Sequence, residues 1–544
     1  MHIYPIILGI LVAIVNAELP WYYGRPYPGA STQGGVWPLP WSIQYDTFNH
    51  TINPRQFQFI SKVGSCDVID KAIKRYQKLT FPLYNPKKYS DYHASLSSLT
   101  IDVKSGCDTQ VPQLNMDESY SLKVDKNEEV AVLTANQVWG ALRGLETFSQ
   151  LVFQPVRNKY LIRTATVQDQ PRFPHRGTLI DTGRHFLSLS IILQHLDVMS
   201  QNKMNVLHWH IVDSESFPYT SAKFPNMSLL GAYTPAHIYS IADMKKVIDY
   251  ARLRGIRVVP EFDTPGHSGS WGYSIPNLLS QCYDSKGKIN QLPNIMDPTI
   301  PANYEFLSSF FEEALTLFGD KFIHFGGDEV ESDMEQCWAN NPEVAKRMKA
   351  MGYNSTHDLL DYYWKKLFGL IDKVHPGTQK IVWQEVLDMN VTVSDAIAHV
   401  WKGNSAEAIR EKMANVTAAG HFAILSSCWY LDIIKWNPDW GQYYECDPTD
   451  FEGTDKQKAR VLGGEAALWG EYVDGTNFMP RMWPRASAVA ERLWSNLEQT
   501  KSHGASWPRL HEFRCRMMNR GFAAQPPNAP DYCPFEWNPI YEEL

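Results

Sequence analysis

The chain has 544 residues, of which 20% are charged and 44% are hydrophobic, and its formal net charge at pH 7 is −8. These values are typical of a soluble globular protein, and the length is sufficient for two domains, one of them as large as a barrel. The negative charge argues against nucleic acid or an anionic membrane surface as the main partner.

The first residues of the chain resemble a targeting segment. Their apolar stretch is too short to span a bilayer comfortably, and Val15 and Ala17 are small residues at positions −3 and −1 of a cleavage site. Residues 1–17 are therefore predicted to be a cleaved signal peptide. The stretch is not preceded by Lys or Arg, which leaves a buried first helix as the alternative. No later segment approaches membrane-spanning length without charges.

The cysteine content agrees with passage through an oxidising compartment. The eight cysteines are widely spaced and include no Cys-x-x-Cys pair, so disulfides are favoured over zinc or redox chemistry. We expect each cysteine to pair with its neighbour in sequence, which is one of about 105 possible connectivities. For Cys428 and Cys446 a free thiol is the alternative. The other cysteines are Cys66, Cys107, Cys282, Cys337, Cys515 and Cys533.

Five Asn-x-Ser/Thr sequons also fit the secretory route. One sequon is weak evidence, but five on a chain with a signal peptide indicate a glycoprotein. They lie at Asn49, Asn226, Asn354, Asn390 and Asn415.

The N-terminal part of the chain predicts a small α+β domain over residues 18–170. It begins with an irregular arm, residues 21–40, rich in Gly, Pro and aromatic residues. Residues 122–124 and 130–133 are strand-like, whereas 71–78 and 138–151 have helical patterns. Two prolines within residues 168–175 then break the pattern, so we place the domain boundary there.

From residue 171 to 544 the pattern predicts a (β/α)₈ barrel with a C-terminal extension. Short apolar runs rich in strand-forming residues alternate with helical patterns, such as residues 189–202, 241–254, 304–318, 356–374 and 406–419. The connection between the fifth and sixth strands is too short for a full helix, so one helix of the barrel should be degenerate. The eight predicted strands are 177–181, 205–212, 257–262, 322–325, 380–383, 396–400, 422–425 and 461–469.

Polar and aromatic residues follow each predicted strand. In such a barrel the active site gathers at the carboxyl ends of the strands. Carboxylates, histidines and aromatic residues converge there without a glycine-rich phosphate loop, a combination that favours a carbohydrate-processing pocket. The 18 tryptophans agree with this, because indole faces stack on the apolar faces of sugar rings.

Several of these residues also have ordinary structural interpretations. An Asp-Glu pair such as Asp328–Glu329 is usually part of a solvated loop, and only Gly326-Gly327 and the barrel context favour a catalytic pair here. His208 and His210 share one strand face, but no further ligands follow at zinc-like spacing, so core histidines are favoured over metal ligands. Trp209 and Trp338 are expected in the core, and Trp429 has no assigned role.

Four motifs together resemble the β-N-acetylhexosaminidases of glycoside hydrolase family 20, and animal lysosomal hexosaminidase subunits in particular. They are His-Phe-Gly-Gly-Asp-Glu-Val (324–330), Trp-His-Ile-Val-Asp (209–213), Pro-Glu-Phe-Asp-Thr-Pro-Gly-His (260–267) and Leu-Trp-Gly-Glu-Tyr-Val (468–473). The resemblance covers nearly the whole chain after the signal peptide. It implies removal of terminal N-acetylglucosamine or N-acetylgalactosamine by a retaining mechanism in which the substrate's own acetamido oxygen is the nucleophile.

The resemblance also implies a role for each site residue. Glu329 would be the proton donor and Asp328 the group that holds the acetamido N–H, with Asp213 and His267 behind Glu329. Tyr430 would donate to the acetamido oxygen. The remaining substrate-binding residues would be Arg184, Trp383, Trp401, Asp432, Trp469 and Glu471.

Partners and location follow from the resemblance alone. It implies no metal or organic cofactor, a homodimer, and glycan substrates from glycoproteins, glycolipids or chitin-type oligosaccharides. The lysosome is the expected destination, with secretion as the alternative. Lysosomal subunits that accept 6-sulfated sugars carry Asn-Arg at the positions of Asp432-Ile433, and those that prefer neutral sugars carry Asp-Leu, so this chain resembles the neutral, β-like type. A secreted chitin-oligosaccharide-degrading enzyme and an inactive sugar-binding protein are the rival hypotheses.

Overall fold

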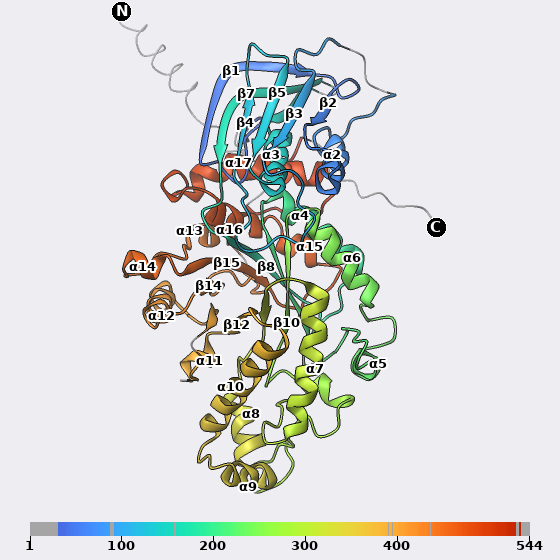
Figure 1. The fold of residues 1–544 in the computed structure, drawn as a ribbon. Helices are drawn as coiled ribbons and strands as arrows, with labels where there is room; N and C mark the ends of the chain where they lie inside the picture. Colours follow the sequence, from blue (N-terminus) through green and yellow to red (C-terminus); the bar gives the residue numbers. More distant parts are fainter. Residues whose placement is uncertain are drawn as a thin grey trace, which may run out of the picture.

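The computed structural model describes residues 31–87, 92–156, 159–389, 391–393, 395–435, 437–528 and 532–534. In Figure 1 the N-terminal sheet lies at the top of the view, the barrel below it, and the last helix runs between them. The predicted signal peptide at residues 1–17 and the sequon at Asn390 lie outside the described residues.

The N-terminal part is a mixed sheet with two helices. Its strand order is β1-β7-β4-β5-β3-β2, with β6 paired to β7. The sequence predicts β4, β5 and both helices but not the other five strands. The two longest of these, β1 and β7, alternate between buried and exposed residues only in part. The elements are β1 (Ser42–Ile52), β2 (Gln58–Ser61), α2 (Asp67–Leu79), β3 (Ser98–Val103), β4 (Tyr120–Val124), β5 (Val130–Ala135), α3 (Val138–Leu151), β6 (Val152–Val156) and β7 (Lys159–Asp169).

The second part is a closed barrel of eight parallel strands, as predicted. The observed strand ends agree with the predicted ones to within about two residues because each apolar run is buried along its length and bounded by polar residues. The strands are β8 (His175–Asp181), β9 (Val206–Val212), β10 (Arg257–Phe262), β11 (Phe322–His324), β12 (Gln379–Trp383), β13 (Ala396–Val400), β14 (Ala423–Leu425) and β15 (Val461–Leu468).

Helices cover the outside of the barrel. The longest are α4 (Leu189–Gln201), α6 (Ile241–Arg252), α7 (Pro301–Phe318), α10 (Thr356–Val374), α12 (Ala406–Ala418), α16 (Arg485–Trp494) and α17 (His503–Asn519). Between β12 and β13 stands only the four-residue α11 (Glu385–Asp388), which confirms that one helix is degenerate. The shorter elements are α5 (Asn226–Gly231), η1 (Gly269–Tyr273), α8 (Glu331–Asp333), η2 (Met334–Ala339), α9 (Pro342–Ala350), α13 (Trp440–Glu445), α14 (Asp455–Lys458), α15 (Phe478–Met482) and η3 (Leu497–Gln499).

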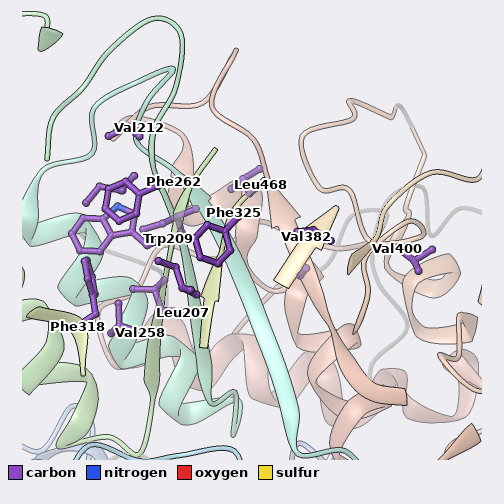
Figure 2. Packing of buried hydrophobic residues seen from close by; sticks show 14 of the residues in the cluster. Leu207, Trp209, Val212, Val258, Phe262, Phe318, Phe325, Val382, Val400 and Leu468 are labelled. Carbon is purple, nitrogen blue, oxygen red and sulfur yellow. The ribbon is translucent and has the colours of Figure 1, made fainter. Parts of the chain in front are cut away.

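The outer faces of the strands form the largest hydrophobic core. Figure 2 shows Leu207 and Trp209 of β9 beside Phe262 of β10 and Phe318 of α7. Trp209 meets Phe318 edge to face, with ring centroids 6.3 Å apart. Trp209 and Trp338 are both fully buried, as expected of core residues.

The inside of the barrel is stacked in levels. The lowest level is an apolar plug to which seven strands contribute one side chain each. Because side chains alternate along a strand, the inward residue two positions further along lies one level higher. The plug consists of Val206, Val259, Phe322, Ile381, Ile397, Ile424 and Leu462. The level above it holds His208, Glu261, His324, Trp383 and His399, joined from β15 by Glu465.

Buried ion pairs join the two domains. Glu118 of the N-terminal part accepts from Arg176 of β8 at 2.6 Å, and Asp169 at the end of β7 accepts from Lys203 at 2.8 Å. Helix α17 adds a further contact, because the Arg516 guanidinium donates to three carbonyls at the C-terminal end of α3 and the start of β6.

All eight cysteines form disulfides, and each pairs with its neighbour in sequence as predicted. The pairs are Cys66–Cys107, Cys282–Cys337, Cys428–Cys446 and Cys515–Cys533. The free-thiol alternative for Cys428 and Cys446 is therefore wrong. The four described sequon asparagines, Asn49, Asn226, Asn354 and Asn415, are exposed.

Candidate active site

The Asp328–Glu329 pair lies where β11 has ended and the backbone turns sharply. Gly326 and Gly327 have φ values of 70° and 103°, and Glu329 itself has a φ of 55°. A Cβ on Gly326 would lie 1.7 Å from Asp263 Oδ1, and one on Gly327 would lie 2.4 Å from Val386. Only glycine fits at both positions, so the Gly-Gly of the motif is what allows the two carboxylates to share one strand end.

The two carboxylates differ in environment. Asp328 is buried, and among the described residues its Oδ1 has no hydrogen-bond partner. The Glu329 side chain is 59% exposed. Both approach one nitrogen, because His267 Nε2 lies 3.8 Å from Asp328 Oδ2 and 3.6 Å from Glu329 Oε2. The nearby His267 imidazole lowers the pKa of Glu329 below its usual value.

Behind this pair, His267 belongs to a dense set of charges. Its Nδ1 lies 3.1 Å from Asp213 Oδ1, and Arg184 Nη1 lies 3.0 Å from Asp213 Oδ2. Although burial opposes it, Asp213 together with Asp328 raises the pKa of His267 well above its usual range. Burial likewise disfavours the Arg184 cation, but Asp181 and Asp213 raise its pKa. Both groups are therefore cations at neutral pH.

Four aromatic side chains form a cluster next to the acidic pair. Tyr430 stacks on Trp401 with ring centroids 6.0 Å apart, and Trp383 lies 5.9 Å from Trp469. Trp383 and Trp469 are buried, whereas Trp401 and Tyr430 are partly exposed. Burial, reinforced by Asp328, raises the pKa of Tyr430 well above 10, so its hydroxyl is a neutral hydrogen-bond donor.

Two further acidic residues lie at the rim. Burial, together with Glu471, raises the pKa of Asp432 to about 6, and its Oδ1 has no hydrogen-bond partner in the described part of the chain. Glu471 is exposed, and the neighbouring Ile433 is 52% exposed.

The level below the site holds buried ion pairs that the sequence analysis did not assign. Glu261 Oε2 lies 2.9 Å from His208 Nε2 and 2.8 Å from His210 Nδ1, and Glu261 Oε1 accepts from the Trp383 indole at 2.8 Å. His208 also bonds to Glu465 at 2.7 Å. Burial opposes protonation of His208, but Glu465 and Glu261 raise its pKa to about 9.

His208 and His210 are thus core histidines held by carboxylates. His210 Nε2 bonds to Asp213 Oδ2 at 2.6 Å, which links this level to Asp213 and His267 behind Glu329. The signal that the sequence analysis missed is the two-residue step along each strand, which places Glu261 on the same face as Val259.

Glu385 is a further residue to which the sequence assigned no role. It begins α11, accepts the backbone N–H of Glu329 at 3.3 Å and the Trp401 indole at 3.2 Å, and pairs with Lys402. Its position after the strand end at Trp383 was the available signal.

The sequence profile described as "Glycosyl hydrolase family 20, catalytic domain" matches residues 173–497, and one described as "beta-acetyl hexosaminidase like" matches residues 36–151. The chain belongs to glycoside hydrolase family 20. The match to the catalytic domain includes all eight strands of the barrel, β8 to β15.

The relatives agree with this assignment. A Caenorhabditis briggsae protein named beta-hexosaminidase A is 46% identical over 97% of this chain and 98% of its own length. The human beta-hexosaminidase subunit beta is 45% identical over 94% of this chain and 92% of its own length. The solved Flavobacterium johnsoniae chitobiase has a TM-score of 0.76 at 28% identity, covering 90% of this chain and 73% of that one.

The chain is therefore a glycoside hydrolase that removes terminal N-acetylglucosamine or N-acetylgalactosamine with retention. The rival hypothesis of an inactive sugar-binding protein is not supported. Within the described residues, no helix is long and apolar enough to cross a membrane.

The structure brings the predicted site residues together at the carboxyl ends of the strands. Trp383 lies deeper than the other tryptophans of the site, since it is 1% exposed against 9% for Trp469, and its indole bonds to Glu261. The remaining predicted residues lie around the Asp328–Glu329 turn and the aromatic cluster: Arg184, Asp213, His267, Trp401, Tyr430, Asp432, Trp469 and Glu471.

Proposed function

We propose that Glu329 and Asp328 carry out the hydrolysis by substrate assistance. The main support is the contrast between these two adjacent carboxylates. Asp328 is buried, and its Oδ1 has no hydrogen-bond partner among the described residues, whereas the Glu329 side chain is mostly exposed. A buried acceptor without a partner is costly, so it is suited to hold the acetamido N–H of a bound sugar. An exposed carboxyl is suited to reach the glycosidic oxygen.

In this mechanism the acetamido oxygen attacks the anomeric carbon while Glu329 gives its proton to the leaving oxygen. The resulting oxazolinium is opened by water, whose proton returns to Glu329. Holding an internal nucleophile in place is worth effective molarities of about 10⁵–10⁸ M. Asp328 stabilises the positive charge that develops on the acetamido nitrogen, and the neutral Tyr430 hydroxyl donates to its oxygen.

The proton affinity of Glu329 depends on its surroundings in the complex. His267 lowers the pKa of Glu329 in the open pocket. A sugar placed over the half-exposed carboxyl removes water from it, and such burial raises the pKa of a carboxyl. We expect substrate binding itself to prepare the proton donor, with Asp213 holding His267 in place behind it.

Two measurements test substrate assistance. A thiazoline that mimics the cyclised intermediate should inhibit competitively and much more tightly than N-acetylglucosamine, because it resembles the state that the site stabilises. Glycosides without the 2-acetamido group should be very poor substrates. Efficient cleavage of plain β-glucosides, or a sugar trapped covalently on an enzyme carboxylate, would show that the mechanism is wrong.

Substrate range is the next part of the proposal. The acidic Asp432 and the uncharged Ile433 at the rim favour neutral sugars over 6-sulfated ones, because a carboxylate repels sulfate and no cation follows it. Arg184 would bind sugar hydroxyls together with Asp432 and Glu471, while Trp401 and Trp469 would enclose the ring and the acetamido group.

We further propose a glycosylated homodimer delivered through the secretory pathway to the lysosome, with secretion as the alternative destination. The four exposed sequon asparagines and the disulfides support the secretory route. Ile433 and Ile434, 52% and 75% exposed beside the site, are an apolar surface that a second subunit would cover. The mass of the protein in solution tests the dimer.

A further inference from the structure

Glu385 lies between two parts of the site that come from different strands. Its Oε2 accepts the backbone N–H of Glu329 at 3.3 Å and the indole N–H of Trp401 at 3.2 Å. The carboxylate is only 6% exposed. One buried oxygen thus joins the turn that carries the proton donor to the most exposed tryptophan of the aromatic cluster.

The residue before it makes a parallel set of contacts. Gln384 Oε1 accepts the backbone N–H of Trp401 at 2.7 Å and that of Lys402 at 3.3 Å. Strands β12 and β13 pair in register, with Trp383 opposite His399, so the residues after one strand lie beside those after the other. Gln384 therefore fixes the backbone of Trp401, while Glu385 fixes its ring.

Glu385 also brings a third negative charge close to Asp328 and Glu329. Burial, reinforced by Asp328, raises the pKa of Glu385, and the ion pair with Lys402 opposes this rise. The same lysine lowers the pKa of Glu329 through space. The other titratable groups that face the three carboxylates are His267 and Arg184 toward Glu329, and His267 and Asp263 toward Asp328.

We propose that Glu385 is a positioning residue for the reaction, holding Trp401 and the backbone of Glu329 in one arrangement, and that Lys402 is the counter-ion that allows it to be charged there. The inference rests on the proposed role of Glu329 as proton donor. Glu385 itself need not touch the substrate. It acts on the geometry of the donor and of the sugar-binding wall, and its charge acts on the proton affinity of Glu329.

Three variants test this on an aryl N-acetylglucosaminide. Glu385→Ala removes both acceptor contacts and should lower kcat/KM on the order of tenfold or more, because small misplacements of a catalytic group are costly. Glu385→Gln keeps an acceptor oxygen and should restore most of that loss. Asp388→Asn is the matched control. It breaks a comparable ion pair, in which Lys412 Nζ lies 2.9 Å from Asp388 Oδ1, at the other end of α11 and away from the site.

The pH dependence of kcat/KM tests the charges, because its alkaline limb reports loss of the donor's proton. Glu385→Gln removes a negative charge and frees Lys402, so the pKa of Glu329 falls and the limb should move to lower pH. Lys402→Met leaves Glu385 uncompensated, so the limb should move to higher pH. Each shift should be roughly 0.3–1 pH unit, and the double variant should return toward the wild-type position.

These outcomes separate a positioning role from structural damage. Structural damage would lower the activity of Glu385→Gln and of Lys402→Met, but it would not move the alkaline limb of the kcat/KM profile in opposite directions in the two variants. A Glu385→Ala enzyme within about twofold of wild type, or a limb that stays in place in Glu385→Gln and in Lys402→Met, would overturn the proposal. If Glu385→Ala does not fold, the two charge variants still decide. A wild type that does not hydrolyse the substrate would instead refute the proposed function.

Discussion

The middle and upper levels of the barrel interior contain the same kinds of residues in different circumstances. In the middle level Glu261 and Glu465 are at most 2% exposed, and each forms ion pairs of 2.6–2.9 Å with two histidines. Glu261 also lies 3.2 Å from His324 Nδ1. In the upper level Asp328 and Asp432 each keep an oxygen without a partner in the described chain, and Glu329 is mostly exposed. A buried carboxylate that forms close ion pairs with histidines is part of the framework, whereas one that is exposed, or that has no ion pair this close, is available for a substrate.

The comparison predicts opposite consequences for stability and activity. Charges in the middle level should matter first for folding, since an unpaired buried charge is expensive. Charges in the upper level should matter first for turnover. If variants at the two levels do not differ in this way in their effects on stability and turnover, the distinction between the levels is wrong.

The largest effect is expected at Glu329. Glu329→Gln cannot donate a proton and should lower kcat on oligosaccharides by about 10²–10⁴-fold, while thermal unfolding stays close to wild type because the side chain is mostly exposed. Aryl glycosides with activated leaving groups need less protonation and should lose less in the bond-breaking step. Near wild-type turnover of an oligosaccharide by this variant would remove Glu329 from the role of proton donor.

The next effect is expected at Glu465. It bonds to His175 at 2.6 Å and to His208 at 2.7 Å, and it is 2% exposed. Glu465→Leu should lower the free energy of unfolding by about 3–5 kcal/mol, measured with denaturant. The exposed ion pair between Arg410 and Asp450 provides the control, and Asp450→Asn should change stability by about 1 kcal/mol or less.

The same comparison has a pH signature. The pKa of His208 is about 9 in the folded protein and about 6.5 when unfolded, so its imidazolium stabilises the fold fully below about pH 6.5. That contribution is lost as the pH rises through about 9. The stability difference between wild type and Glu465→Leu should therefore shrink over this window. A difference that is constant from pH 6 to about 9.5 would contradict a charged His208.

The barrel was predictable from the sequence because burial on both faces leaves an apolar run at every strand. The long strands β1 and β7 of the N-terminal sheet were not, because each is partly exposed and mixes polar with apolar residues. Within the site, Asp328 and Glu329 were identified through the Gly-Gly motif. The structure supplies the reason for that motif, which is the lack of room for a Cβ next to Asp263 and Val386.

Glu385 and Glu261 show what the sequence could not reveal. Glu261 lies near the end of a strand and Glu385 follows one, but so do several residues without comparable contacts. Only the structure shows that Glu385 contacts both Glu329 and Trp401. The position of Trp383 is a similar case. Sequence places it at a strand end, while packing against His399, with ring centroids 4.3 Å apart, places it at the buried end of the aromatic cluster.

A smaller effect is expected at the rim, where Asp432 and Ile433 are proposed to set substrate charge preference. Wild type should prefer neutral glucosaminides and galactosaminides over the 6-sulfated form. Asp432→Asn combined with Ile433→Arg should raise the relative rate on the sulfated substrate by roughly tenfold, because a repulsion is removed and a cation is added. Equal wild-type rates on neutral and sulfated substrates would refute this role for Asp432.

The smallest expected effect is the pH dependence of the preference for neutral over 6-sulfated substrates. It tests whether the carboxylates of the upper and middle levels differ in their protonation. The pKa of Asp432 is about 6, raised by burial and by Glu471. Above this pH the carboxylate is charged and repels sulfate, and below it the carboxyl is neutral and the repulsion disappears. The ratio of kcat/KM for neutral over sulfated substrate should therefore fall as the pH drops from about 7 to about 5. The Asp432→Asn side chain cannot gain a proton in this range, so the ratio for that variant should stay constant. A wild-type ratio that is equally constant would show that Asp432 does not face the sulfate.

The carboxylates of the middle level behave differently. Although burial opposes it, His208 and its neighbours hold the pKa values of Glu261 and Glu465 well below the usual range, so both stay ionised between pH 7 and pH 5. The pH response of the substrate preference therefore tests Asp432 without changing the charges of Glu261 and Glu465.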